Sequence, residues 1–296
     1  MMQTVLATAV VLALALPVRA EVRVVATTST MAMLVREVGG PAVSITTLAP
    51  PDRDPHYLLA RPSMMVALRR ADLLVAVGAD LEVGWLPAAI QGAANPRVLP
   101  GQPGYFEGAA QITLIETGEV ADRARGDVHP MGNPHFHMDP IRMVAVARAL
   151  AARLGALDPS SKNLFASRAA AFASAIEPRA AEWRRQAAGA PGVVFYHRDG
   201  NYLAAFLGVP VVGYIEPLPG IAPTASHLRE LVTRLAGTRG VIIYNTFHPR
   251  EGADFLGRQL GWKTAQLPLE VPLDATGSAY LSLVDQWVRV IAGGAP

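Results

Sequence analysis

Short β-branched segments alternate with segments of helical periodicity along most of this chain, and that alternation restricts the possible folds more than any other feature. The strand candidates are Val22–Ala26, Val43–Leu48, Leu73–Val77, Val193–Tyr196, Pro210–Tyr214 and Val241–Asn245. The helix candidates are Thr30–Val38, Pro62–Arg70, Ile141–Leu154, Asn201–Leu207, Thr224–Leu235, Glu251–Leu260 and Ala279–Ile291. Such alternation is typical of parallel sheets covered by helices. We therefore predict an α/β fold.

The predicted strands form two groups separated by a wholly helical stretch, which predicts two lobes. Within this stretch Asp158 can cap a helix that begins near Pro159, and Gly189 follows its end. About thirty helical residues would extend roughly 45 Å, the length of a two-domain body. The prediction is an N-terminal lobe (21–157), a long rigid linking helix (158–189) and a C-terminal lobe (190–296), each lobe with a central, mostly parallel sheet flanked by helices.

Residues 1–20 have the features of an export signal, with a short apolar core and a small-residue ending at Ala20. Cleavage after Ala20 would make Glu21 the mature N-terminus. The apolar run is shorter than the roughly 20 residues that a membrane-spanning helix needs. The chain has no cysteine, which excludes a lipid-modified N-terminal cysteine, disulfides and thiolate metal sites. We therefore expect a protein of the bacterial periplasm.

The charge balance argues against nucleic acid as a partner. The formal net charge is only +2, and one of the positive residues, Arg19, lies in the predicted export signal. No basic field that could hold nucleic acid remains in the mature chain. Because cysteine is absent, any metal must be held by nitrogen and oxygen atoms.

Histidines occur in three loops that connect predicted strands and helices. His56 follows the strand Val43–Leu48, His135 precedes the helix that begins at Ile141, and His197 follows the strand Val193–Tyr196. The ends of parallel strands are where ligands bind in open α/β sheets. A lone histidine in such a loop is more often structural. Three of them, on both sides of the predicted lobe boundary, favour a metal site.

The motifs around these histidines resemble those of a known family. They are Asp54-Pro55-His56, Asn133-Pro134-His135-x-His137-x-Asp139-Pro140 and His197-x-x-x-x-Tyr202-Leu203. They are similar to the successive motifs of the metal-specific solute-binding proteins of ABC importers, the zinc and manganese receptors. The resemblance covers nearly the whole mature chain. It implies two α/β lobes joined by a rigid helix, with one metal ion in the cleft between them.

The resemblance also implies a ligand set. His56 and His135 would come from the first lobe, His197 from the second, and a carboxylate from a loop near the C-terminal end. For that carboxylate we select Asp274, with Glu270 as the alternative, although Asp274 can also cap the following helix. In an extended loop His135 and His137 point to opposite sides. We expect His135 to be the ligand and keep His137 as the alternative.

Other polar residues near these motifs have structural interpretations. His129 can help to capture metal, because many family members carry a long histidine-rich loop in this region, but here we expect an exposed loop residue with a minor role. Glu216 is expected to be structural or to support a ligand. Asp199 and Arg198 are candidates to orient His197, because metal-bound imidazoles donate their other nitrogen to a carboxylate or carbonyl.

The predicted donor set favours zinc as the bound metal. Imidazole nitrogen suits zinc, copper, iron and nickel, whereas manganese prefers oxygen. Three histidines and one carboxylate would close a tetrahedral shell, whereas a catalytic zinc site keeps one position open for water. The sequence also lacks the motifs His-Glu-x-x-His and Gly-x-Ser-x-Gly. We therefore predict a binding protein and not an enzyme.

The predicted function is that of a periplasmic zinc receptor, which captures Zn²⁺ and delivers it to an ABC-type permease in the inner membrane. A receptor for manganese or another divalent metal is one alternative, and a zinc-dependent hydrolase is a weaker one. A periplasmic zinc chaperone is an additional candidate partner. We expect the protein to be a monomer.

Overall fold

The computed structural model describes residues 21–118 and 129–293. The predicted export signal at residues 1–20 and the last residues of the predicted C-terminal lobe, 294–296, lie outside the described residues. Within the described part of the chain, no helix combines the length and the apolar character needed to cross a membrane.

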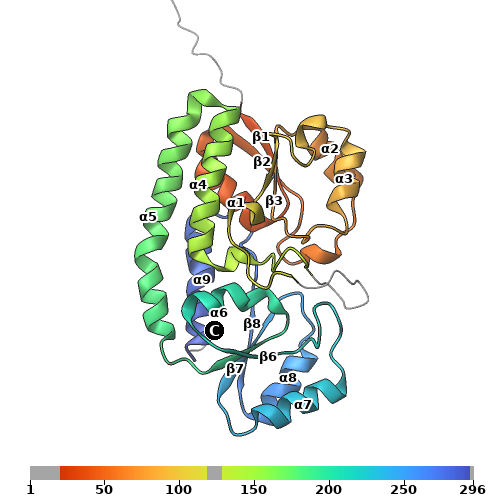
Figure 1. The fold of residues 1–296 in the computed structure, drawn as a ribbon, viewed down its shortest axis with the longest axis vertical. Helices are drawn as coiled ribbons and strands as arrows, with labels where there is room; N and C mark the ends of the chain where they lie inside the picture. Colours follow the sequence, from red (N-terminus) through yellow and green to blue (C-terminus); the bar gives the residue numbers. More distant parts are fainter. Residues whose placement is uncertain (1–20, 119–128, 294–296) are drawn as a thin grey trace, which may run out of the picture.

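Two four-stranded parallel sheets form the framework, one from each half of the chain (Figure 1). The first has the order β2-β1-β3-β4, and its strands are β1 (Val22–Ala26), β2 (Val43–Thr47), β3 (Leu73–Ala76) and β4 (Tyr105–Glu107). The second has the order β6-β5-β7-β8, and its strands are β5 (Gly192–Phe195), β6 (Val211–Tyr214), β7 (Gly240–Asn245) and β8 (Lys263–Leu267). The predicted α/β class, with a parallel sheet in each half, is confirmed.

Helices cover both sheets, and most of them match the predicted ones within three residues. The helices of the first half are α1 (Ser29–Gly39), α2 (Pro62–Arg70), α3 (Leu86–Ala93), α4 (Pro140–Leu157) and α5 (Lys162–Ala187). Those of the second half are α6 (Asn201–Leu207), α7 (Ala225–Leu235), α8 (Glu251–Leu260) and α9 (Gly277–Ile291). Helices α2 and α3 pack on one face of the first sheet, and α7 and α8 on one face of the second.

The sequence analysis missed α3 and the two strands β4 and β8. Strand β4 has only three residues, too few for a periodic signal. Strand β8 lies at the edge of its sheet and begins with the exposed Lys263, so its apolar content is low. Helix α3 is short and contains Gly92, a weak helix former, near its end.

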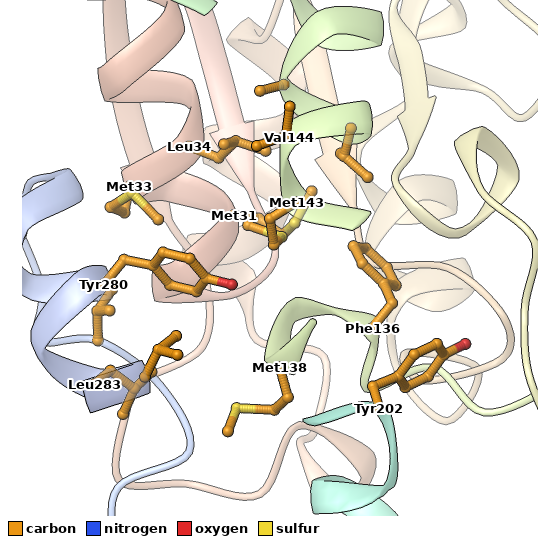
Figure 2. Close-up of a cluster of buried hydrophobic side chains, with 14 of the residues drawn as sticks. Met31, Met33, Leu34, Phe136, Met138, Met143, Val144, Tyr202, Tyr280 and Leu283 are labelled. Carbon is orange, nitrogen blue, oxygen red and sulfur yellow. The ribbon is translucent and has the colours of Figure 1, made fainter. Parts of the chain in front are cut away.

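One hydrophobic core extends through both halves of the molecule. It contains residues of both sheets, such as Val24 and Val193, together with side chains from α1, α4, α5, α6 and α9. Figure 2 shows part of it, where side chains from α1, α4, α6 and α9 lie around Phe136 and Met138. Because protein interiors are closely packed, a core shared in this way resists large movements of one sheet against the other.

Helix α5 spans 26 residues along one side of the molecule (Figure 1). It packs against α1, α4 and α9. Phe172 and Trp183 are buried in these contacts, and the indole Nε1 of Trp183 donates to Asp285 Oδ1 on α9 over 2.6 Å. The long helix is therefore anchored along its length to helices from both halves of the chain.

Candidate metal centre

The side chains of His56, His135 and His197 converge, although they come from three separate loops. Each presents one ring nitrogen to a common point, and these three nitrogens lie within 4.8 Å of one another. The ring centroids are 5.2 to 5.4 Å apart. The structure thus brings together the three histidines that the sequence analysis selected, in an arrangement able to hold a metal ion.

His56 is positioned by a carboxylate two residues before it in the chain. Asp54 caps the short 3₁₀ helix Pro55–Tyr57, where its Oδ1 accepts from the backbone N–H of His56 over 2.9 Å. The same Oδ1 lies 2.7 Å from His56 Nδ1, so Nδ1 donates to it and Nε2 faces the cluster. Burial alone would raise the pKa of Asp54, but the charge and hydrogen bonds of His56 lower it to about 2. Asp54 is therefore an ionised acceptor that selects one tautomer of His56.

His197 has an equivalent carboxylate partner from another strand end. It follows β5, and its Nδ1 lies 2.8 Å from Oε2 of Glu216, which follows β6. The same oxygen accepts from the backbone N–H of Gly220 over 3.0 Å. Burial would lower the pKa of His197, but the hydrogen bond to Glu216 and the charge of Asp199 raise it.

The residues proposed to orient His197 from sequence were Asp199 and Arg198, and the structure assigns this contact to Glu216 instead. Asp199 is buried and accepts from the side-chain amide of Asn245. Burial raises the pKa of Asp199 to about 6. Its charge acts on His197 through space. The sequence analysis gave Glu216 a structural or ligand-supporting role but did not name the ligand, because the contact depends on how β5 and β6 pair.

His135 differs from the other two because its ring has no hydrogen-bond partner. It is 2% exposed, and neither Nδ1 nor Nε2 is hydrogen-bonded. Burial, followed by the proximity of His56 and His197, holds the pKa of His135 well below its ordinary value. A buried imidazole that is neutral and unpaired is costly unless a ligand uses its lone pair.

The loop that carries His135 is anchored by the hydrophobic core. Along this loop His135 and His137 alternate with Phe136 and Met138, which are buried in the core together with side chains of α1 and α4 (Figure 2). Two tyrosines hold the backbone: Tyr202 donates to the carbonyl of Asn133, and Tyr280 donates to the carbonyl of His137, each over 2.8 Å. This loop is therefore held by contacts with α6 and α9 from the other half of the chain.

His137 does not join the cluster. Its Nε2 lies 3.3 Å from the carbonyl oxygen of Leu269 and 3.9 Å from Oε1 of Glu270. Glu270, the alternative fourth ligand, is buried and accepts from the backbone N–H of Thr30 over 2.7 Å and from Ser29 Oγ over 3.1 Å. This carboxylate therefore binds the N-terminus of α1, where the helix dipole favours a negative charge.

Asp274, the carboxylate selected from sequence, also lies outside the histidine cluster in this structure. Its side chain is 94% exposed, and Oδ1 pairs with the Arg36 guanidinium over 3.1 Å. Its φ of +60° places it in the left-handed region of a turn just before α9. The turn directs the carboxylate to solvent, so this residue occupies a surface position.

His129 has a different position from the exposed one expected from sequence. It is half-buried, and its Nε2 lies 3.1 Å from Nε2 of His56. Burial, followed by the proximity of His56 and His197, lowers the pKa of His129 to about 3. A small pocket adjoins the cluster, and its lining includes His129, His135 and His197. The sequence analysis considered His129 as a residue that can help to capture metal, but it did not predict this contact with His56.

Glu116 also lines this pocket and links segments from the two halves of the chain. Its Oε2 accepts from Asn133 Nδ2 over 3.2 Å, and its Oε1 accepts from the amide of Asn201 on α6. Arg198 NH1 lies 3.7 Å from the same carboxylate. The sequence analysis did not select Glu116, and no local motif distinguishes it.

Comparison with known proteins gives a family match over nearly the whole chain. Residues 24–294 match the family described as ZnuA, zinc-uptake complex component A, periplasmic. Among curated relatives, the metal ABC transporter substrate-binding lipoprotein ScbA of Streptococcus cristatus is 21% identical over 226 residues, which is 74% of this chain and 70% of that protein. Several other streptococcal relatives are matched over about half of their length.

Solved structures share the fold. A crystal structure of ZnuA has a TM-score of 0.77 at 19% identity and covers 93% of this chain and 100% of its own. The solute-binding protein FpvC from Pseudomonas aeruginosa, in complex with Mn²⁺, has a TM-score of 0.76 at 21% identity and covers 93% and 98%. At these identities the likeness concerns the fold.

Proposed function

Because this chain belongs to the ZnuA family of periplasmic zinc-uptake components, we propose that it is a receptor that captures Zn²⁺ and delivers it to an ABC-type permease in the inner membrane. The family consists of transport binding proteins and not of enzymes. The chain is accordingly a divalent-metal-binding protein of an ABC importer. We propose, beyond this, which metal the protein binds, which residues are its ligands and which partner receives it.

We choose zinc as the bound metal because three imidazoles converge at the site. His56, His135 and His197 offer nitrogen ligands within 4.8 Å of one another. Nitrogen-rich sites suit zinc, whereas manganese prefers oxygen. The names of the relatives point in both directions, since PsaA of Streptococcus pneumoniae is described as a manganese protein. We therefore base the choice of metal on the ligand atoms of this chain and not on the names of its relatives.

Two of the ligands are held ready by carboxylates. Asp54 and Glu216 accept from the Nδ1 atoms of His56 and His197, which leaves each Nε2 available for the metal. Such contacts fix the tautomer and raise the basicity of the ligand. His135 adds a neutral imidazole whose position is set by the core beneath its loop.

Metal capture closes the cluster by a small movement. Two nitrogen ligands of one tetrahedral zinc lie about 3.3 Å apart, because each bond is about 2.0–2.1 Å long. The present spread of up to 4.8 Å must therefore shrink by about 1.5 Å. We assign His56 and His135 to a lobe over 21–157 and His197 to a lobe over 190–296. The shared core and α5 favour local loop movement over a wide hinge.

The proposed location is the periplasm, after cleavage of an export signal at Ala20. The permease would recognise the surface formed when the metal holds the loops together. A periplasmic zinc chaperone is a further proposed source of the metal, and the receptor is proposed to act as a monomer.

Metal analysis and titration test the proposal. Protein isolated from the periplasm should contain zinc at about one ion per chain. His56→Ala, His135→Ala and His197→Ala should each weaken zinc binding at neutral pH by at least about tenfold, a free-energy loss of about 1.4 kcal/mol. His227→Ala is the matched control, because that histidine bonds the Tyr214 carbonyl outside the cluster. Full zinc affinity in the three cluster variants would contradict the proposed site, and bound manganese in place of zinc would contradict the metal.

A further inference from the structure

A second pocket lies in the first half of the chain, where strands β3 and β4 end. It has a volume of about 420 Å³, and its walls are the segment after β3 (78–83), α3, the turn at Leu99 and Pro100, and β4. Its described lining contains none of the three histidines of the cluster. Ligands of open α/β sheets bind at the carboxyl ends of strands, and small-molecule sites have volumes of roughly 300–1,000 Å³. The place and the size of this pocket, which we call the α3 pocket, therefore fit a small molecule.

Most of the lining of the α3 pocket is apolar. Leu86 and Ile90 of α3 belong to the core on one face of the first sheet, whereas Val83 and Leu99 are exposed. Single exposed apolar side chains are common on protein surfaces, but these two lie beside buried apolar residues in one concave surface. The α3 pocket can therefore remove the apolar body of a ligand from water, which favours binding.

The charged groups of the α3 pocket are carboxylates. Its described lining includes Asp80, Glu82 and Glu107, and no lysine, arginine or histidine. The hydrogen bonds that Glu82 and Glu107 accept come from uncharged donors. Glu107 Oε1 accepts from the Tyr105 hydroxyl over 2.8 Å, and Glu82 accepts from two backbone N–H groups that follow β3. The pocket therefore carries negative charge that no cation in its described lining balances.

Asp80 is held at the pocket by a turn of unusual conformation. The φ angles of Gly78, Ala79 and Asp80 are +83°, +50° and +65°, in the left-handed region that residues other than glycine seldom occupy. The buried carboxylate of Glu82 stabilises this turn, since it accepts from the backbone N–H groups of Val77 and Gly78 over 2.8 and 3.0 Å. Backbone strain of this kind persists only where the surrounding structure imposes it. The backbone of Asp80 is therefore fixed before a ligand binds.

We propose that the α3 pocket binds a small organic cation. The apolar body of this ligand lies against Val83, Leu86 and Leu99, and its amine or guanidine group meets Asp80 and Glu107. The apolar lining supplies affinity. The carboxylates select positive charge, because a cation that leaves water needs a partner of opposite charge. This site is separate from the proposed zinc site and does not depend on it.

Other occupants fit the lining less well. A metal ion needs several ligand atoms around one point. Among the described residues, the histidine cluster is the one group of three or more potential ligand side chains close enough to share an ion. A neutral molecule would leave the charge of Asp80 and Glu107 without a partner, and an anion would be repelled by it. The sign of the ligand's charge therefore separates these occupants.

The test uses the full mature chain without metal and three probes of similar shape. They are 2-phenylethylamine, which is a cation at neutral pH, neutral 2-phenylethanol and anionic 3-phenylpropionate. Addition of the amine to isotope-labelled protein should change the amide chemical shifts of residues 78–91 and 99–107 in a saturable way. The amine should bind at least about threefold more tightly than the alcohol, since partly exposed charge pairs add modestly to affinity. The anion should bind more weakly than both.

Two variants remove the charge and keep the shape of the pocket. Asp80→Asn and Glu107→Gln should each weaken binding of the amine by at least about twofold and leave binding of the alcohol unchanged. Asparagine tolerates the positive φ of residue 80, and glutamine still accepts from the Tyr105 hydroxyl. A structural role alone would weaken both probes alike. Glu230→Gln, an exposed position on α7, is the control and should match the wild type.

Equal binding of the amine and the alcohol would overturn the assigned class of ligand, and so would unchanged amine binding in both Asp80→Asn and Glu107→Gln. No saturable shifts at the α3 pocket would overturn the site. His135→Ala separates this inference from the proposed function, because it should lose zinc and bind the amine as the wild type does. Loss of amine binding in His135→Ala would place the amine at the histidine cluster and overturn the inference.

Discussion

His197 and Glu216 form a nearly buried pair in which Nδ1 of the imidazole lies 2.8 Å from Oε2 of the carboxylate. The two side chains are 8% and 13% exposed. They follow the neighbouring strands β5 and β6, so the parallel pairing of those strands determines their contact. The pair orients the one ligand that the second half of the chain contributes to the cluster.

Glu216→Gln should weaken zinc binding about 10- to 100-fold, as is typical when a group that supports a metal ligand is replaced. The amide oxygen still accepts from Nδ1, but it no longer adds negative charge to the imidazole. Zinc titration at about pH 8 measures the loss, and the unfolding curve of the metal-free variant checks that the fold is intact. Glu230→Gln on the exposed face of α7 is the control. Equal affinities in wild type and Glu216→Gln would show that the pair has no part in binding.

Zinc affinity should decrease as the pH falls through the pKa of His197, and the decrease should begin above about 6.5. Glu216 and Asp199 raise the pKa of His197 against the effect of burial, so the metal must displace a proton there. His135 should add nothing in this range, because its pKa is lowered. Titration calorimetry in buffers of different ionisation enthalpy measures the released proton. An affinity that stays constant from about pH 8 to about pH 6 would contradict this prediction.

The raised pKa of His197 also affects the stability of the metal-free protein, which should gain from it at low pH, where zinc affinity is weakened. A folded-state pKa above the unfolded value stabilises the protein below about pH 6.5, and this contribution is lost as the pH rises through the folded-state value. Denaturant unfolding of the metal-free protein should therefore show that Glu216→Gln costs more stability at about pH 6 than at about pH 8. A cost that does not depend on pH would be evidence against the charged pair.

Glu270→Ala should destabilise the metal-free protein by about 1–3 kcal/mol, because the buried N–H of Thr30 loses its acceptor. Glu270→Gln keeps an acceptor oxygen and should cost less. Zinc affinity should change less than tenfold in both variants, since this carboxylate bonds α1 outside the histidine cluster. Chemical denaturation and zinc titration of the two variants provide the measurements. Loss of zinc binding with unchanged stability would instead identify Glu270 as a ligand.

Asp274→Asn should leave zinc affinity unchanged within about twofold and stability within about 1 kcal/mol. The side chain is 94% exposed, and exposed ion pairs such as the one with Arg36 contribute little. Asparagine is the suitable replacement, because it tolerates the positive φ of this position. A tenfold loss of zinc affinity would restore Asp274 as the fourth ligand.

Much of the fold could be predicted because its signals are local. The alternation of β-branched and helical segments indicated two parallel sheets, and the ends of α2, α6 and α8 agree with the predicted ranges. Strand ends also indicated where His56 and His197 would lie, since ligands bind at the carboxyl ends of parallel strands. His135 was placed by the start of the helix that follows it. Short or edge elements such as β4 and β8 carried too weak a periodicity.

The sequence by itself determined the fold class and the three histidines, because both follow from residue patterns that repeat over a few positions. Only the tertiary structure decided which carboxylate meets which partner. Glu270 and Thr30 are 240 residues apart in the chain, and His129 and His56 are 73 apart. Such contacts depend on how the two sheets, α1 and α9 pack around one core. A hydrogen bond or metal ligand is effective only over about 3 Å, so packing and not residue type alone selects the group that lies within reach.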